Sequence, residues 1–266
     1  MLIRRLTAGA VAGILTVLVV GCQGSDPATN DALATTPTPP PASTPATKSA
    51  SPPPASTPTP TKPAITITGL SATSILRKTQ AAAKAATSVR MKGSLTDGKE
   101  RMVLDVQLTR TGGQGSITID GAAMSVLVVG RTAYLKLSDK FWRSQTKTQA
   151  EADAIVGLIA GRWIKTSLDN EELRDFALFA SKTEFFDTLF EPSGKLRKTA
   201  PRTVDGVASI GLRDADGTLW VDTATARPVR LESSSTDALS FSDYNRIPAP
   251  KAPPAAQVID GKALGM

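Results

Sequence analysis

The chain has 266 residues, a formal net charge of +7, no histidine and a single cysteine. These totals exclude an intrachain disulfide, a Ser-His-Asp or Cys-His catalytic site and a zinc site of the His/Cys kind. We therefore expect no enzyme activity, no cofactor and no metal site. Basic and acidic residues alternate along the chain, and no basic run is interleaved with aromatics, so nucleic acid is not an expected partner. The dispersed positive excess is typical either of a solvated surface or of contact with anionic surfaces.

The N-terminal segment has the pattern of a secretory leader. Arg4 and Arg5 precede an apolar stretch from Leu6 to Gly21. That stretch is shorter than the ~20 residues of a spanning helix. A positive start, a short apolar centre and small residues at the end predict a signal peptide over residues 1–21. The alternative is an uncleaved anchor helix with an incidental cysteine.

The end of the leader, Val19-Val20-Gly21-Cys22, resembles the bacterial lipobox. The resemblance implies that the Cys22 thiol receives a diacylglyceryl group and that cleavage leaves Cys22 as the new N-terminus. We expect the lipidated chain on the outer leaflet of the cell membrane, facing the extracytoplasmic space. Residues 22–69 are dominated by Pro, Thr, Ser and Ala, which predicts a disordered tether behind the lipid anchor.

The first part of the remaining chain predicts one helix followed by strands. A helical apolar stripe covers about 72–87 in an alanine-rich segment. From Val89 to Leu137, apolar residues then alternate with polar ones, and turn residues interrupt them. This pattern predicts an antiparallel meander of about five strands, half-buried on one face.

Two helices and a second group of strands are predicted next. Thr148 and Glu151 fit a capping box for a helix that ends at Gly161. A Phe-rich helix is expected from Asp169 to just before Pro192. About five strands follow, and the acidic residues between them are expected to form turns rather than a calcium site. The tail, 251–266, is expected to lack regular structure.

The order of these elements is helix, strands, helices, strands, without parallel βαβ alternation. It predicts an α+β domain over 70–250, with a large antiparallel sheet and helices on one face. The apolar sheet face and the Phe-rich helix admit two interpretations. They pack together as a dry core, or they stand apart and enclose a cavity.

Several segments in chain order are similar to the LppX/LprG type of actinobacterial lipoprotein, which has the LolA/LolB-like half-barrel fold. They include "RTAYLKL", "FWRSQ", "GLIAGRWIKTS", "TLWVDTATARPVRLE" and "FSDYNRIPAP". The resemblance implies a curved, half-open barrel of about ten strands with helices over its concave side. It also implies that lipid or lipoglycan acyl chains are held between them.

The resulting hypothesis is an exported lipoprotein that binds and carries acyl chains in the cell envelope, with a lipid or lipoglycan ligand and no identified protein partner. The alternative is a non-transporting cell-wall or sensory module that binds a protein or polymer through its surface. The resemblance carries over no individual ligand residue. From the strand alternation and the Phe-rich helix, we expect the lining to include Met102, Leu104, Val106, Leu108, Ile117, Ile119, Phe176, Phe179 and Leu189.

Overall fold

The computed structural model describes residues 66–97, 99–159, 161–169 and 181–264. The predicted leader, the lipidation site Cys22 and nearly all of the predicted tether lie outside these residues. None of the helices in the described ranges is long and apolar enough to cross a bilayer.

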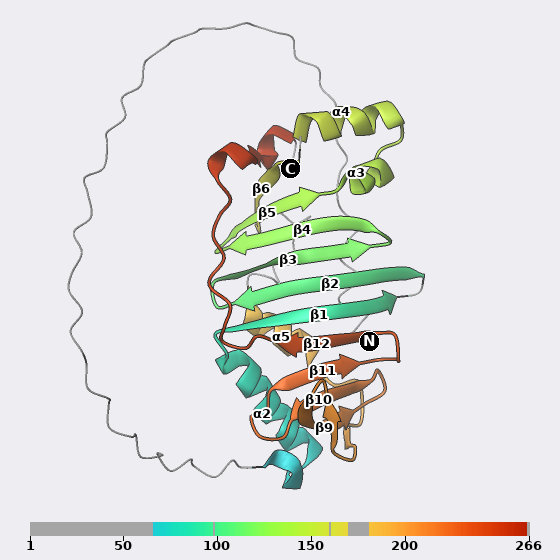
Figure 1. The fold of residues 1–266 in the computed structure, drawn as a ribbon, viewed down its shortest axis with the longest axis vertical. Helices are drawn as coiled ribbons and strands as arrows, with labels where there is room; N and C mark the ends of the chain where they lie inside the picture. The colour runs from blue at the N-terminus through green and yellow to red at the C-terminus, as the bar shows by residue number, and fades with distance from the viewer. Residues whose placement is uncertain (1–65, 98, 160, 170–180, 265–266) are drawn as a thin grey trace, which may run out of the picture. The chain divides into compact units, whose positions relative to one another are not determined.

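The described residues form one large sheet with helices packed against it (Figure 1). Thirteen strands are present in this part of the chain, where the sequence predicts about ten. They are β1 (Ser88–Asp97), β2 (Glu100–Thr109), β3 (Gly112–Ile119), β4 (Ala122–Val129), β5 (Thr132–Leu137), β6 (Trp163–Ser167), β7 (Arg197–Lys198), β8 (Arg202–Val204), β9 (Val207–Arg213), β10 (Thr218–Asp222), β11 (Pro228–Glu232), β12 (Ala238–Ser242) and β13 (Val258–Asp260).

The strand order is β13-β6-β5-β4-β3-β2-β1-β12-β11-β10-β9-β7, with β8 also paired to β9. Each half of the sheet contains an antiparallel meander of sequence neighbours, β1 to β6 in one half and β9 to β12 in the other. The two halves join in the middle, where β1 pairs with β12 and Met91 lies opposite Phe241. The predicted α+β class is confirmed: the structure is a large, open and curved sheet with helices packed against it (Figure 1).

The longer helices are α2 (Ala72–Ala85), α3 (Asp139–Gln145), α4 (Gln149–Ile159) and α5 (Lys182–Leu189). The capping box of α4 forms as predicted: Glu151 N donates to Thr148 Oγ1 at 3.2 Å, and Thr148 N donates to a Glu151 carboxylate oxygen at 3.3 Å. These bonds satisfy backbone donors that the helix itself leaves free. Three short 3-10 helices are also present in the described ranges: η1 (Ile67–Gly69), η3 (Ala255–Gln257) and η4 (Gly261–Leu264).

Two parts of the predicted order are wrong. The sequence "WIKTS" forms β6, a strand between the helices where none is expected. The C-terminal tail is also not irregular, because β13 pairs in parallel with β6, with Ile259 opposite Ile164. The physical reason is that β6 would otherwise be an open sheet edge with unpaired backbone groups. The sheet is therefore mixed at this edge and antiparallel elsewhere.

Candidate functional site

The concave face of the sheet carries apolar rows that run across the strands. In one row, Leu104 on β2 lies opposite Ile117 on β3, which lies opposite Met124 on β4, which lies opposite Leu137 on β5. A neighbouring row joins Met102 to Ile119. Since alternate residues of a strand point to one face, these rows continue the alternation seen in the sequence. They form one extended apolar surface that the helices cover.

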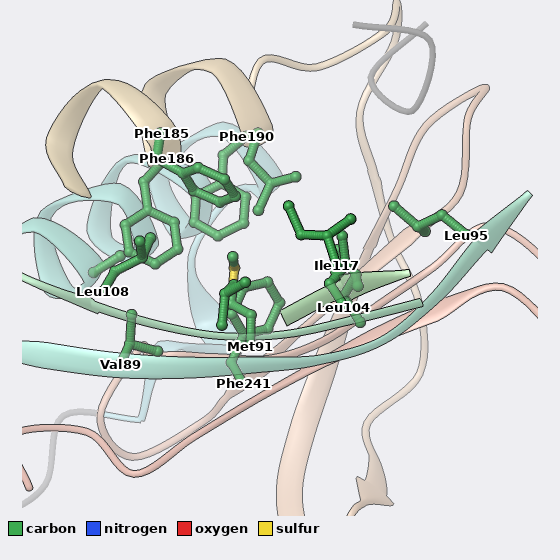
Figure 2. Close-up of a cluster of buried hydrophobic side chains, with 14 of the residues drawn as sticks. Val89, Met91, Leu95, Leu104, Leu108, Ile117, Phe185, Phe186, Phe190 and Phe241 are labelled. Carbon is green, nitrogen blue, oxygen red and sulfur yellow. The ribbon is translucent and has the colours of Figure 1, made fainter. Parts of the chain in front are cut away.

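Helix α5 covers this surface where the two halves of the sheet meet. Phe186 stacks on Phe190 with ring centroids 5.2 Å apart, and Phe241 of β12 lies 6.2 Å from Phe186. Figure 2 shows the Phe186 and Phe190 rings above Met91 of β1, with Phe241 beside Met91. Phe186 is fully buried. Under α5 these buried side chains pack against one another in one core cluster.

A pocket of about 260 Å³ opens beyond α5, between α3 and the ends of β3 and β4. Its apolar wall is formed by Ile117, Ile119, Ala122, Met124 and Phe141. Ile117 and Met124 are buried, and Phe141 of α3 is partly buried. In Figure 2, Ile117 and Leu104 lie to the side of the α5 phenylalanines rather than beneath them. The same concave face is therefore closed at α5 and open at α3.

The charged and polar residues of this pocket stand at its rim. Glu100, Asp120, Lys140, Ser144 and Gln145 line the opening and are all exposed. A small-molecule site in a protein has a mostly apolar wall with a few polar groups and a volume of about 300–1,000 Å³. The pocket has this chemistry and lies just below that size. It suits an apolar chain whose polar end stays at the rim.

Local sequence explains how the two walls of the pocket are positioned. Asp120 and Gly121 have φ values of 47° and 81°, so the β3–β4 turn uses the left-handed backbone typical of a tight hairpin. Ser138 caps α3 by accepting from Phe141 N at 3.3 Å. Lys140 Nζ donates to the Asp120 carbonyl oxygen at 2.6 Å. This bond ties the first turn of α3 to the hairpin, directly across the mouth of the pocket.

Helix α3 is also fixed by contacts with the core and with α4. Trp142 is buried in the core and makes an edge-to-face contact with Phe141, with ring centroids 5.6 Å apart. Arg143 pairs with Asp153 of α4 at 2.9 Å. Because α3 is fixed on both sides, Phe141 is presented to the pocket in a defined position.

The structure separates the predicted lining residues into groups. Ile117 and Ile119 line the pocket at α3. Met102 and Leu104 lie next to them in the register of β2, while Val106 and Leu108 are buried in the same core toward α5. Leu189 lines a different crevice of only about 40 Å³, beside Leu76 and Leu212. Phe176 and Phe179 lie outside the described residues. A role in ligand contact stays a prediction for all of them.

Sequence reasoning missed the polar rim and three residues of the apolar wall, namely Ala122, Met124 and Phe141. The alternation of β4 places Ala122 and Met124 on the same face as Ile117 and Ile119, so a signal for these two was present. Phe141 had only a weak signal, the Ser138 cap before a short helix. Its position depends on how α3 packs against the sheet.

Comparisons with known proteins identify a similar fold but no function for this chain. No family model matches the chain, and no curated protein matches it. Among solved structures, LprF from Mycobacterium bovis matches with a TM-score of 0.43 and 14% sequence identity, over 68% of this chain and 96% of that chain. LprF is of the LppX/LprG type, the family that the sequence resembles. Similarity at this level assigns neither a ligand nor a function to this chain.

Proposed function

We propose that this chain is a membrane-anchored lipoprotein whose domain binds an acyl chain of a lipid or lipoglycan and carries it within the cell envelope. The observation that supports this function best is the apolar pocket at α3. It continues the apolar row of the sheet face and has its charged residues only at the rim. An amphiphile has the same division between chain and headgroup.

Apolar burial supplies the driving force for this binding. Each methylene removed from water contributes about 0.8 kcal/mol. The wall offers two isoleucines, a methionine and a phenylalanine for contact with such a chain. Carriage requires that the chain leave again, and a pocket open at one side suits reversible binding better than a closed cavity.

The proposed anchor is Cys22. In this proposal the leader is removed, the new N-terminal cysteine carries the acyl groups, and the Pro-rich segment 22–69 links it to the domain. The protein would then act on the outer face of the membrane, with the membrane and its lipids as partners. The support comes from the residue pattern before Cys22.

A matched pair of substitutions tests the pocket. Ala122 lines the pocket, whereas its neighbour Ala123 is exposed and points to the opposite face of β4. Ala122→Phe should fill the pocket and lower the uptake of a fluorescent fatty acid at least tenfold. Ala123→Phe adds the same ring outside and should bind like the parent.

Mass spectrometry of the gently extracted parent protein gives an independent readout. Lipid should co-purify with the parent and with the Ala123→Phe variant, and should be depleted from Ala122→Phe. A parent protein that takes up no fatty acid and holds no lipid would sink the proposal. It would favour the surface-binding wall or sensory module instead.

A further inference from the structure

The edge of the sheet farthest from the pocket carries a basic segment. In "KLRKTAPR", residues 195–202, four of eight residues are basic and none is acidic. Strand β7 forms the edge here and consists only of Arg197 and Lys198, both exposed. A short, positively charged edge strand discourages pairing with another sheet. That role alone does not account for the charges next to it.

Two arginines face each other across this edge without compensation. Arg197 lies directly opposite Arg213 in the β7–β9 register, so both side chains leave the sheet on the same side. Among the residues that the structure describes, neither guanidinium group has an ion-pair or hydrogen-bond partner. Like charges at directly opposed positions of a strand pair lower stability. An anion bound between them would remove that cost.

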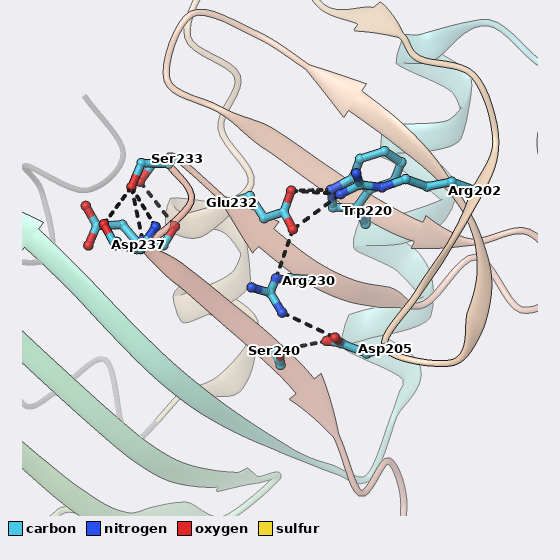
Figure 3. Close-up of polar contacts among 10 residues, drawn as sticks. Arg202, Asp205, Trp220, Arg230, Glu232, Ser233, Asp237 and Ser240 are labelled. Atoms are coloured by element: carbon cyan, nitrogen blue, oxygen red, sulfur yellow. Dashed lines mark hydrogen bonds and ion pairs between the residues drawn. The ribbon is translucent and has the colours of Figure 1, made fainter.

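The neighbouring arginines are arranged differently. Arg202 lies 3.9 Å above the Trp220 ring and 3.1 Å from Glu232, and Arg230 pairs with Asp205 at 3.2 Å and with Glu232 at 3.0 Å (Figure 3). The guanidinium groups of Arg202 and Arg230 are therefore already paired with carboxylates of the domain. The contrast singles out Arg197 and Arg213 as cations that remain available to an external partner.

Asp214, which follows Arg213 in sequence, forms no ion pair with it among the described residues. The Asp214 carboxylate accepts hydrogen bonds from the backbone N–H groups of Ser193, Asp216 and Gly217, at 2.8–3.1 Å. It is therefore committed to the turn. Arg213 also borders a polar hollow of about 310 Å³, whose lining includes Arg230 and the carboxylates of Asp214, Asp216 and Glu232. Because acidic side chains line this hollow, an anionic partner is expected on the Arg197 side of Arg213 and not inside the hollow.

The described chain begins at this same edge. Lys198 Nζ donates to the Thr68 carbonyl oxygen at 2.9 Å, and Ile67 N donates to the Thr223 carbonyl oxygen at 3.2 Å. The segment that leads back to Cys22 thus enters the domain next to the basic cluster.

We infer that the cluster of Lys195, Arg197 and Arg213, here called the basic edge, docks on an anionic membrane surface. Its occupant is the phosphate layer of an anionic bilayer, selected by charge complementarity and by the entry of the tether at the same edge. The inference rests on the proposed membrane location and not on acyl-chain binding. Loss of vesicle binding and loss of fatty-acid uptake are therefore separate results that test the two proposals independently.

Vesicle flotation tests the basic edge without the lipid anchor. The test protein begins at residue 22 and carries Cys22→Ala. All strands and both apolar clusters of the described domain lie after residue 66, so this chain keeps the whole described fold. It should bind vesicles of phosphatidylglycerol and phosphatidylcholine in equal parts, and should bind pure phosphatidylcholine vesicles far less.

Removing the two unpaired arginines should weaken that binding. A basic residue near an anionic surface contributes roughly fivefold to partitioning, so Arg197→Gln with Arg213→Gln should reduce it on the order of 25-fold. The matched control is Lys136→Gln with Lys165→Gln, which removes two exposed charges from β5 and β6 in the other half of the sheet. The control should bind like the parent, and both variants should keep the parent's circular dichroism and fatty-acid uptake.

Competition separates a membrane surface from a single phosphate site. Sodium chloride and glycerol phosphate should release the protein at similar ionic strength, because the interaction is screened over about 10 Å or less. The inference is overturned if both vesicle types bind equally, or if the control loses as much binding as the arginine variant. Release by glycerol phosphate far below the effective salt concentration would also overturn it, since that result indicates a site for the free headgroup.

Discussion

Lys182 Nζ lies 2.6 Å from the carbonyl oxygen of Ala83, near the C-terminal end of α2. It also donates to the Lys84 carbonyl oxygen at 2.9 Å. Lys182 is the first residue of α5 and is only 4% exposed. One ammonium group therefore satisfies two carbonyls that the helix leaves without intrahelical donors, and it fixes the Phe-rich helix to α2.

Lys182→Met should destabilise the domain, because it keeps the apolar stem but leaves two carbonyls without their donor. The expected loss in the free energy of unfolding is about 1–3 kcal/mol, measured by urea denaturation. Lys165→Met on the exposed side of β6 is the control and should change it by less than about 0.5 kcal/mol. Equal stability of the two variants would contradict the structural role of Lys182.

Asp105 should make the domain sensitive to acid. Arg90 forms a two-pronged hydrogen bond with Asp105 at 2.6 and 2.7 Å, and this holds the carboxyl pKa below its ordinary value of 3.8. The unfolded state then binds more protons, so the stabilisation is complete above the ordinary pKa and is lost as pH falls through the lowered one. In Asp105→Asn, this part of the pH dependence of unfolding should be absent.

The same pair can be followed directly by NMR. In Arg90→Gln the Asp105 carboxyl loses its bidentate donor, so its titration midpoint should move up toward 3.8. Identical midpoints in the parent and the variant would show that Arg90 does not set this pKa.

Gly93 should be intolerant of any side chain. It lies on β1 beside β12, and a Cβ atom there would be 1.9 Å from the Ala238 carbonyl oxygen. Gly93→Ala must push the two strands apart, with an expected loss of about 1–3 kcal/mol or more in thermal or urea unfolding.

Gly157 provides the contrasting case. It lies within α4, and a Cβ atom there would meet nothing within 4 Å. Gly157→Ala should therefore raise stability by about 0.5–1 kcal/mol through helix propensity. If both alanine variants shift stability alike, the close approach at Gly93 is not the cause.

Cys22→Ala should separate anchoring from folding. Without its thiol the chain has no acceptor for the diacylglyceryl group, so the protein should leave the membrane fraction or stay unprocessed. Fractionation and intact mass report the location and the lipid. The domain should still bind fatty acid. A variant that matures and stays on the membrane like the parent would contradict the lipobox interpretation.

Removal of β13 should expose an edge of the sheet. A chain that ends at Gln257 lacks the parallel partner of β6, and the backbone groups of β6 become free to pair with another molecule. The melting temperature should fall, and size-exclusion chromatography should show larger species. An unchanged elution volume and melting temperature would mean that β13 contributes little.

The local sequence pattern correctly predicts those elements whose pairing partners are close in sequence. The hairpin of β1 and β2 keeps the predicted facing of Val89, Met91 and Leu95, and all three are buried. The Thr148–Glu151 cap was readable because it depends on residues three apart. Strands β6 and β13 were not readable, since they are short and their pairing joins segments almost a hundred residues apart.

For the candidate site, the sequence predicts the apolar face of the sheet but not the position of the pocket on that face. Alternation identifies the face that contains Ile117 and Ile119, but it does not say which part of that face a helix fills. Leu108 belongs to the same pattern and is fully buried, toward α5. The division between packed core and open pocket depends on where α3 and α5 pack, which is a property of the whole sheet.

The seam between β1 and β12 bears on when this domain can fold. Thr87 N donates to Asn245 Oδ1 at 2.7 Å across 158 residues of sequence, and the adjacent strands pair residues that are 144 to 152 positions apart. Contacts of such long range are slow to form, because loop closure comes before any gain from pairing. Until the last strands emerge, β1 is an unpaired edge next to a finished meander. The order in which the chain is synthesised thus leaves the sheet incomplete until β12 has been made.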